Sequence, residues 1–144
     1  MDVSRVGVRV PLGADRVRAV ATRVLAAERC RAAMIAITFV DERTIARLNR
    51  RHVGHSGATD IVTLEHTRGP GGVIVGDVYI APAVARANAH AAGHGVREEL
   101  ARLTVHGVLH ALGWTHPEDD RRTRSPMWRR QESLLGAAKR EGVI

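Results

Sequence analysis

The chain has 144 residues, of which 44% are hydrophobic, which is enough for one ordinary globular core but too few for two separate domains. Its 22 lysine and arginine residues outnumber 15 aspartate and glutamate residues, and the formal charge of +7 favours a polyanionic partner. No apolar run approaches the roughly 20 residues of a membrane span and the N-terminus lacks a signal-peptide core, so we expect a single cytoplasmic domain over residues 1–144 with no membrane contact.

Aromatic residues make up only 3% of the sequence, so a stacking platform for unpaired bases is poorly supplied. Any contact with RNA is therefore expected to be mainly with phosphate, which arginine binds well. The single cysteine, Cys30, cannot form an internal disulfide, and we expect it to be a small buried side chain.

The N-terminal part of the chain alternates strand and helix patterns. Valines predict a first strand over residues 3–10, ended by a proline and glycine turn signal. A helix with one apolar face follows over residues 15–27, capped by Asp15. A short apolar strand over residues 34–40 then precedes a second helix that begins at Asp41.

The middle of the chain predicts a hairpin followed by a helix. Residues 60–65 and 73–80 have the composition of two strands, joined by a glycine-rich stretch. Pro82 suits the first turn of a helix, which we expect from Ala83 to about Ala92, where glycines end it.

Two further helices complete the predicted fold. The apolar residues over 97–112 are spread too widely for a surface helix, so this helix should be largely buried. A last helix is expected from about Arg121 to Arg140, with Pro126 limiting or kinking its start. Together the elements indicate an α+β fold: a small mixed four-stranded sheet packed with about five helices.

The segment LTVHGVLHALGWTHPEDD carries the strongest functional pattern. His106 and His110 are four residues apart on the buried helix, so they lie one turn apart on the same face. Gly113 can adopt the left-handed conformation that ends a helix, and the chain would then bring His116 back to the same point. Three histidines with water as a fourth ligand would form an open zinc site, in which the pKa of the water falls toward neutrality.

Each part of this pattern has a simpler explanation when taken alone. Two histidines four residues apart occur by chance on many helices, and only the glycine turn and the third histidine make the pair a predicted metal site. The same spacing occurs in metzincin proteases, whose second motif residue is a glutamate general base. Here that residue is Gly107, which disfavours a protease and allows close packing against a neighbouring element.

At these residues the chain resembles the YbeY family of bacterial ribosomal-RNA maturation factors, whose hallmark is H-G-x-L-H-x-x-G-[YF]-x-H. The segment HGVLHALGWTH matches every fixed position except Trp114. Further matches occur in the same order along nearly the whole chain, namely Leu48-Asn49, Thr59-Asp60, Gly76-Asp77, Met127 and Glu132.

The resemblance implies a metal-dependent endoribonuclease with one zinc ion held by His106, His110 and His116. It also implies a preference for single-stranded RNA, processing of the 3′ end of small-subunit rRNA and a role in ribosome quality control. The expected partners are ribosomal RNA, the small ribosomal subunit and ribosome-associated proteins. A zinc-stabilised assembly factor that binds rRNA without cutting it is the main alternative, and a metalloprotease is a weaker one.

The chain departs from the family pattern where an arginine is expected. Family members commonly have N-x-x-Y-R before the T-D pair, whereas this chain has His52-Val53. Arg50 or Arg51 lies one turn or less away and is a candidate replacement, with Arg51 the candidate catalytic residue. The following segment, Ala58 to Leu64, and Ala81 also differ from the usual residues.

Several other residues have two interpretations each. Arg121, Arg122 and Arg124 are candidates for binding RNA phosphate, or form a solvated helix face. Trp114 is expected to shield the metal site or to stack on a base, and Asp77 to orient a metal ligand or to cap a turn. Thr59 and Asp60 are expected to form a local turn, and Glu118 to Asp120 a loop that caps the last helix. The five remaining histidines are expected at the surface or in loops: His52, His55, His66, His90 and His94.

Overall fold

The computed structural model describes residues 1–53, 59–65 and 70–144. Four strands form one sheet in the order β1-β2-β4-β3, with β1 at Asp2–Arg5, β2 at Ala33–Phe39, β3 at Ile61–Glu65 and β4 at Ile74–Ile80. The β1–β2 and β2–β4 pairs are parallel and the β3–β4 pair is antiparallel. The predicted mixed four-stranded sheet and the predicted hairpin are confirmed.

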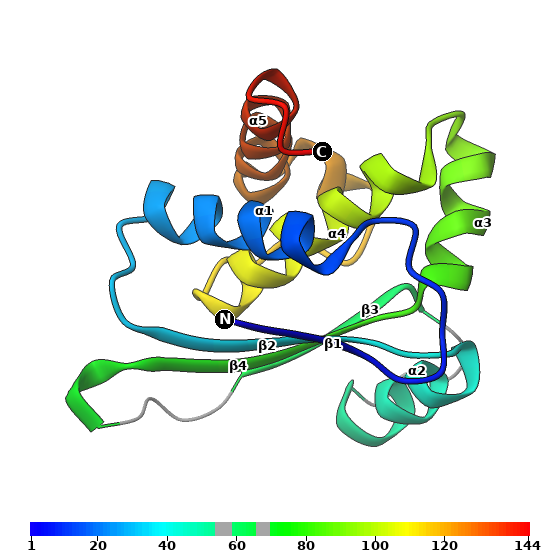
Figure 1. Cartoon of the computed structure of the whole chain (residues 1–144), viewed down its shortest axis with the longest axis horizontal. Helices are drawn as coiled ribbons and strands as arrows, with labels where there is room; N and C mark the ends of the chain where they lie inside the picture. Colours follow the sequence, from blue (N-terminus) through cyan, green and yellow to red (C-terminus); the bar gives the residue numbers. More distant parts are fainter. Residues whose placement is uncertain (54–58, 66–69) are drawn as a thin grey trace.

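Five α-helices surround the sheet within the described ranges: α1 (Ala14–Ala27), α2 (Glu42–Leu48), α3 (Pro82–Ala92), α4 (Val96–Ala111) and α5 (Pro126–Arg140). In Figure 1, α1 and α4 lie over one face of the sheet and α5 lies on their far side. The helix α2 continues into a π-helical turn, η1 (Asn49–Val53), and packs on the other face through a smaller apolar cluster that includes Ile45 and Val62. This arrangement confirms the α+β class.

The helix α4 forms the centre of the core. Its residues Leu100, Val105, Val108 and Leu109 are fully buried, as the sequence predicts. The backbone at Gly107 lies directly against β4, because a Cβ atom there would be 2.5 Å from Cγ1 of Val78. The close approach holds the predicted metal-site helix against the sheet. Among the described residues, none of the helices has the length and apolar character needed to cross a bilayer.

Several element boundaries differ from the predictions. The first strand ends at Arg5 instead of continuing to residue 10, because Gly7 adopts a φ of +65° that takes the chain out of the sheet. The helix α1 is capped by Gly13, whereas Asp15 lies in its first turn and pairs with Arg18 at 2.9 Å.

The last helix begins at Pro126, five residues later than predicted. Ser125 caps it by accepting a hydrogen bond from the backbone N–H of Trp128, and residues 120–124 form a separate 3-10 turn, η3 (Asp120–Arg124). Asp119 caps that turn, so the predicted capping loop serves η3 instead of the long helix. Cys30 is half-buried, in contrast to the buried position predicted for it. His55, Ala58 and His66 lie outside the described residues.

Candidate metal centre

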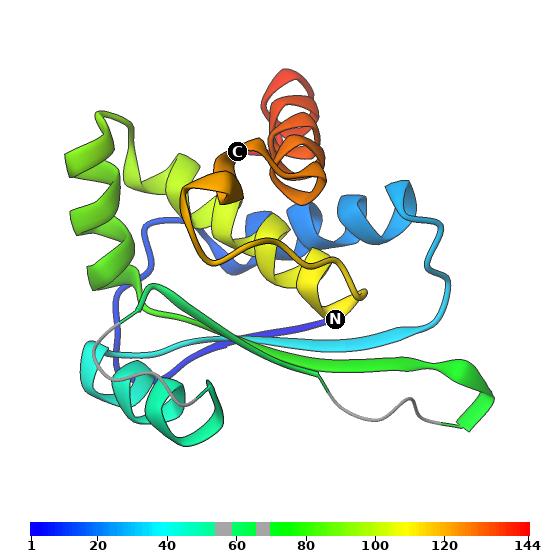
Figure 2. The same cartoon turned by 180° about the vertical axis from the view of Figure 1, so that it is seen from behind.

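The C-terminal half of α4 and the segment after it bring three histidines together. His106 and His110 lie on successive turns of α4, which ends one residue after His110. Gly113 has a φ of +103°, and its N–H donates to the carbonyl of His110 at 2.9 Å. Figure 2 shows the chain then turning back and running alongside α4. His116 thereby reaches the other two histidines, as the spacing predicts.

The three imidazole rings enclose one point. Their centroids are separated by 4.6 Å, 4.8 Å and 5.1 Å, and one nitrogen from each ring lies within 4.8 Å of the others. His106 is only 4% exposed, while His110 and His116 are half-buried and face the open side. A buried ligand on one side and access on the other are typical of a metal site that admits a substrate.

Hydrogen bonds at Nδ1 determine which nitrogen of each ring can bind a metal. The Nδ1 atoms of His110 and His116 lie 2.8 Å from the backbone carbonyl oxygens of Trp114 and Pro117. A carbonyl oxygen only accepts, so both Nδ1 atoms carry a hydrogen, and in the neutral form of each ring the lone pair is on Nε2. The Nδ1 atom of His106 similarly lies 2.6 Å from Oε1 of Gln131.

The two Nε2 atoms of His110 and His116 are 3.1 Å apart. Two lone pairs at this distance repel each other unless a cation or a shared proton lies between them. The geometry therefore fits a metal ion held by three Nε2 atoms. Neutral imidazole is a common ligand of zinc and of other divalent transition metals.

The protonation state of His106 also fits this use. Burial, followed by the neighbouring His110, lowers the pKa of His106 to about 3. The ring is therefore neutral near pH 7, which is the form that coordinates a metal.

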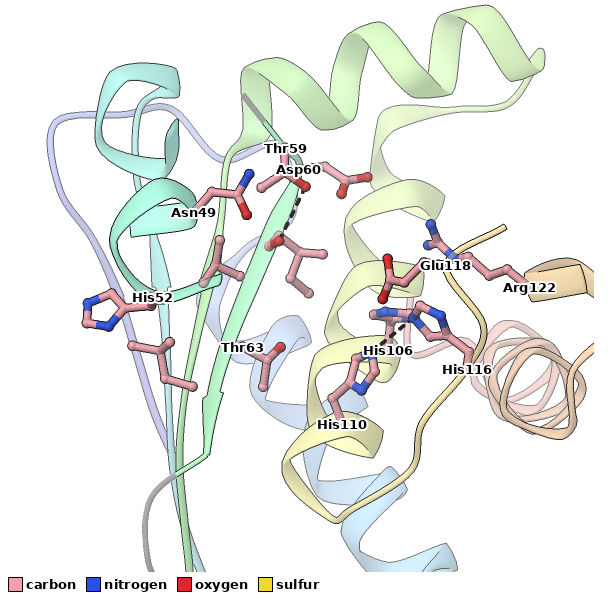
Figure 3. A pocket seen from close by; sticks show the side chains of 13 residues that line it. Asn49, His52, Thr59, Asp60, Thr63, His106, His110, His116, Glu118 and Arg122 are labelled. Atoms are coloured by element: carbon pink, nitrogen blue, oxygen red, sulfur yellow. Dashed lines mark hydrogen bonds between the residues drawn. The ribbon is translucent and has the colours of Figure 1, made fainter. Parts of the chain in front are cut away.

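The histidines lie on one wall of a cleft of about 820 Å³. Figure 3 shows His106, His110, His116, Glu118 and Arg122 on this side, facing β3 and η1 across the cleft. The polar residues on the opposite wall are Asn49, His52, Thr59, Asp60 and Thr63.

Thr59 and Asp60 form more than the predicted local turn. The Thr59 hydroxyl does donate locally, to the carbonyl of Ile61 at 3.4 Å. The Asp60 carboxylate instead accepts from Asn88 on α3 at 3.2 Å, and burial raises its pKa. Both side chains line the cleft, so the turn also shapes the site.

The candidate RNA-binding arginines occupy different places. Arg122 lines the cleft, and its buried Nε atom has no hydrogen-bond partner in the part of the chain that the structure describes. Arg50, Arg51 and Arg124 are exposed and are absent from the described cleft wall. Arg121 is exposed as well and pairs with Asp119 at 2.8 Å.

Two residues expected near the site point elsewhere. The indole of Trp114 donates to Glu28 at 2.6 Å, at the end of α1, and does not belong to the described lining of the cleft. Asp77 lies on β4 between Gly76 and Val78, both of which face α4. Successive strand side chains alternate, so Asp77 faces the opposite side of the sheet from the histidines.

Gln131 is the site residue that sequence reasoning missed. It lies on α5, 25 residues beyond His106, and its amide is 1% exposed. A lone glutamine in a helix carries no local signal for contact with a histidine. The family pattern includes the next residue, Glu132, but not Gln131. His94 lies in the loop between α3 and α4, in agreement with the surface or loop position expected for it, and it is part-buried 2.6 Å from the carboxylate of Glu99.

Fold and site together define an α+β protein with a mixed sheet and a three-histidine candidate metal centre. The family model described as Endoribonuclease YbeY matches residues 9–139, which is most of the chain. The chain therefore belongs to the YbeY family.

Individual relatives agree with this assignment. A protein named Endoribonuclease YbeY from Corynebacterium kroppenstedtii is 43% identical over 63% of this chain, although the match spans only 52% of that relative, about half its length. Proteins of the same name from Acidothermus cellulolyticus and Anaeromyxobacter sp. are 37% and 40% identical over 73% and 90% of this chain, and 70% of each relative is covered.

A solved structure supports the fold. The solution structure of TM1509 from Thermotoga maritima has a TM-score of 0.62 to this chain, covering 99% of this chain and 93% of that one. Its sequence identity of 19% makes this a likeness of fold alone.

Proposed function

We propose that this protein is a metal-dependent endoribonuclease of rRNA maturation, with one zinc ion per chain held by His106, His110 and His116. The observation that carries the proposal is the convergence of three imidazoles in an open cleft, with the Nε2 atoms of His110 and His116 3.1 Å apart. Membership of a family whose relatives are named endoribonucleases supplies the reaction class. When bound, zinc supplies Lewis acidity that activates water and stabilises negative charge.

The residues around the histidines suit a phosphodiester substrate. Arg122 lines the cleft, and its guanidinium group is suited to bind the oxygens of a phosphate. The formal charge of +7 attracts a polyanion from a distance, since charges spread over a surface raise the association rate. In this proposal Arg122 binds the phosphate at the cut site, while Arg50, Arg51, Arg121 and Arg124 contact neighbouring phosphates.

The finer parts of the proposal rest on the family. We propose single-stranded RNA as the preferred form, the 3′ end of small-subunit rRNA as the region cut, and ribosome quality control as the cellular role. This role would place the protein in the cytoplasm. Its partners would be the small ribosomal subunit and the proteins associated with it.

A direct test combines cleavage with metal analysis. Purified protein is incubated with small-subunit rRNA precursor, with and without a chelator, and its zinc content is measured. We expect one zinc per chain and cleavage that the chelator abolishes. Cleavage of equal rate in metal-free protein would contradict the proposal.

A variant pair localises the activity. His110→Ala removes one of three ligands and should lose bound zinc and cleavage together. His90→Ala changes an exposed histidine on α3 and should alter neither. Retention of stoichiometric zinc by His110→Ala would show that the metal lies elsewhere.

The main alternative is a zinc-stabilised assembly factor that binds rRNA without cutting it. The observation that favours it is Val53, which stands where the family pattern has an arginine. Arg51, two residues earlier, is exposed and is not among the residues described as lining the cleft. Tight RNA binding and bound zinc without cleavage would select this alternative. If Arg51 does replace the family arginine, Arg51→Ala should slow cleavage.

The packing at position 107 is a further argument against a metalloprotease. A glutamate at position 107 would have to start from a Cβ atom 2.5 Å from Val78, so its carboxylate would point into the sheet and not toward the histidines. A peptide substrate should accordingly remain intact.

A further inference from the structure

Of the three Nδ1 contacts described above, that of His106 is to a side chain, the amide of Gln131, and the other two are to the backbone. His110 and His116 donate to backbone carbonyls, whose polarity cannot reverse. His106 faces a side-chain amide, whose oxygen and nitrogen have nearly the same size and shape. If this amide turned over, its NH₂ group would face Nδ1, and the hydrogen of His106 would move to Nε2. That nitrogen would then have no lone pair for a metal.

The adjacent residue prevents this reversal. The amide nitrogen of Gln131 donates to Oε2 of Glu132 at 3.0 Å. A carboxylate only accepts hydrogen bonds, so it requires the NH₂ end of the amide. The oxygen end must then face His106, 2.6 Å from Nδ1. Gln131 is 1% exposed and His106 is 4% exposed, so water is poorly placed to substitute for either contact.

Glu132 is itself held in place by a cation. Arg102 on α4 donates to it twice, from Nε to Oε2 at 3.0 Å and from Nη2 to Oε1 at 3.1 Å. This two-point contact sets the plane of the carboxylate as well as its position. The Nη2 atom of Arg102 also donates to Glu98 at 3.3 Å.

We infer that Glu132 determines the tautomer of His106 through Gln131, and that Gln131 and Glu132 are therefore positioning residues of the metal centre. Arg102 holds Glu132, Glu132 selects the orientation of the Gln131 amide, and Gln131 keeps the hydrogen of His106 on Nδ1. The Nε2 lone pair then points toward His110 and His116. The inference rests on the proposed function only in taking the three histidines as metal ligands.

The tautomer can be measured without any metal. Metal-free, full-length protein labelled with ¹⁵N at histidine gives long-range ¹H–¹⁵N spectra that distinguish Nδ1–H from Nε2–H rings. We expect His106 to be Nδ1–H in the unaltered protein. In Gln131→Leu and in Glu132→Gln it should become mixed or Nε2–H. Glu98→Gln is the matched control, because it removes a carboxylate partner of Arg102 that does not touch Gln131, and His106 should stay Nδ1–H.

Zinc affinity gives the second readout, measured by competition with a coloured chelator. Loss of a group that orients a metal-binding histidine typically weakens binding by about 10- to 100-fold. We expect that loss in Gln131→Leu and Glu132→Gln, and no change in Glu98→Gln. If Gln131→Leu fails to fold, two spectra still test the inference: that of the unaltered protein and that of Glu132→Gln, which changes a half-buried side chain.

The possible failures are distinguishable. An Nε2–H ring at His106 in the unaltered protein, or an Nδ1–H ring in both variants, would overturn the inference whether or not zinc binds. An Nδ1–H ring that responds to the variants, in a protein that binds no zinc, would support the control of the His106 tautomer by Glu132 and overturn the proposed metal site.

Discussion

At the scale of single residues, the absence of a side chain at Gly107 allows α4 to pack against the sheet. A methyl group at Gly107 would meet Cγ1 of Val78 at 2.5 Å and two further side-chain atoms at 3.1 Å. Val78 is fully buried on β4 and cannot move away easily. Gly107 lies next to His106, so any shift of α4 away from the sheet also displaces a candidate ligand.

We therefore expect Gly107→Ala to destabilise the protein by about 1–3 kcal/mol, the usual range for overpacking a filled core. The measurement is urea unfolding followed by circular dichroism. Gly136→Ala is the control, because its Cβ atom would meet only the flexible end of Arg140, at 3.3 Å. Within the helix α5 that change should be neutral or stabilise by up to about 1 kcal/mol. Equal effects of the two variants would show that α4 has room to move.

The buried His106 also predicts a pH dependence of the metal-free protein. Burial, then His110, lowers its pKa from the ordinary 6.5 to about 3. Between these values the unfolded chain holds a proton on this residue that the folded chain does not, so lowering the pH through this window favours unfolding. Above pH 6.5 the residue is neutral in both states and contributes no pH dependence.

Chelator-treated protein should accordingly lose stability as the pH falls from 6.5 toward 3, and His106→Gln should lose less over the same range. Carboxylates contribute similarly in both proteins, so the difference between the two curves isolates His106. Denaturant unfolding at several pH values provides the curves. Parallel curves would show that His106 is not held neutral by the fold.

At the scale of elements, the turn after α4 assembles the site. The helix supplies two histidines, and the backbone of Gly113, at a φ of +103°, directs the third toward them. A Cβ atom at Gly113 would meet nothing within 4 Å, so only the backbone conformation restricts this position. The need for glycine at position 113 therefore comes from its positive φ and not from side-chain packing.

Gly113→Ala should cost about 1–2 kcal/mol, because an L-residue is strained at positive φ. It should also weaken zinc binding, since relief of that strain moves His116. Gly93→Ala imposes the same kind of strain at the end of α3, where φ is +76° and a Cβ atom likewise meets nothing. It should lower stability by a similar amount and leave zinc affinity unchanged. Thermal unfolding and chelator competition on both variants separate the two effects.

The sequence predicted the elements well where one local pattern decided them. The wide spread of apolar residues identified α4 as a buried helix, and composition identified β4 as a strand. The H-x-x-x-H-x-x-G-x-x-H spacing identified the three histidines that the structure brings together. Errors occurred where a single residue overrode a longer pattern. Gly7 interrupted a run of alternating valines, and Pro126 with Ser125 started the last helix five residues late.

The contacts of the site depended on long-range packing and were not predictable in the same way. Gln131 reaches His106 only because α5 packs on α4, and Trp114 turns toward Glu28 because α1 ends beside it. Neither contact has a local sequence pattern. The extent of the domain, residues 1–144, stays a prediction.

At the scale of the whole molecule, the five candidate RNA-binding arginines divide into two groups. Arg50, Arg51, Arg121 and Arg124 are exposed, so salt screens them readily. Arg122 lies in the cleft with a buried Nε atom that has no partner among the described residues. The exposed group suits general attraction of RNA, and Arg122 suits stabilisation of charge at the site of cleavage.

These two roles predict different kinetics. Arg122→Gln should slow single-turnover cleavage at saturating RNA by about 100-fold, the scale observed when one donor to a developing negative charge is lost. Arg124→Gln should leave that rate unchanged, weaken RNA binding modestly and reduce the slope of log K against log salt by about 0.7, as for one lost contact with single-stranded RNA. Cleavage rates and salt titrations of both variants test this division. If Arg122→Gln altered only affinity and its salt dependence, Arg122 would belong with the exposed arginines, and charge stabilisation during cleavage would fall to the metal and to residues such as Arg51.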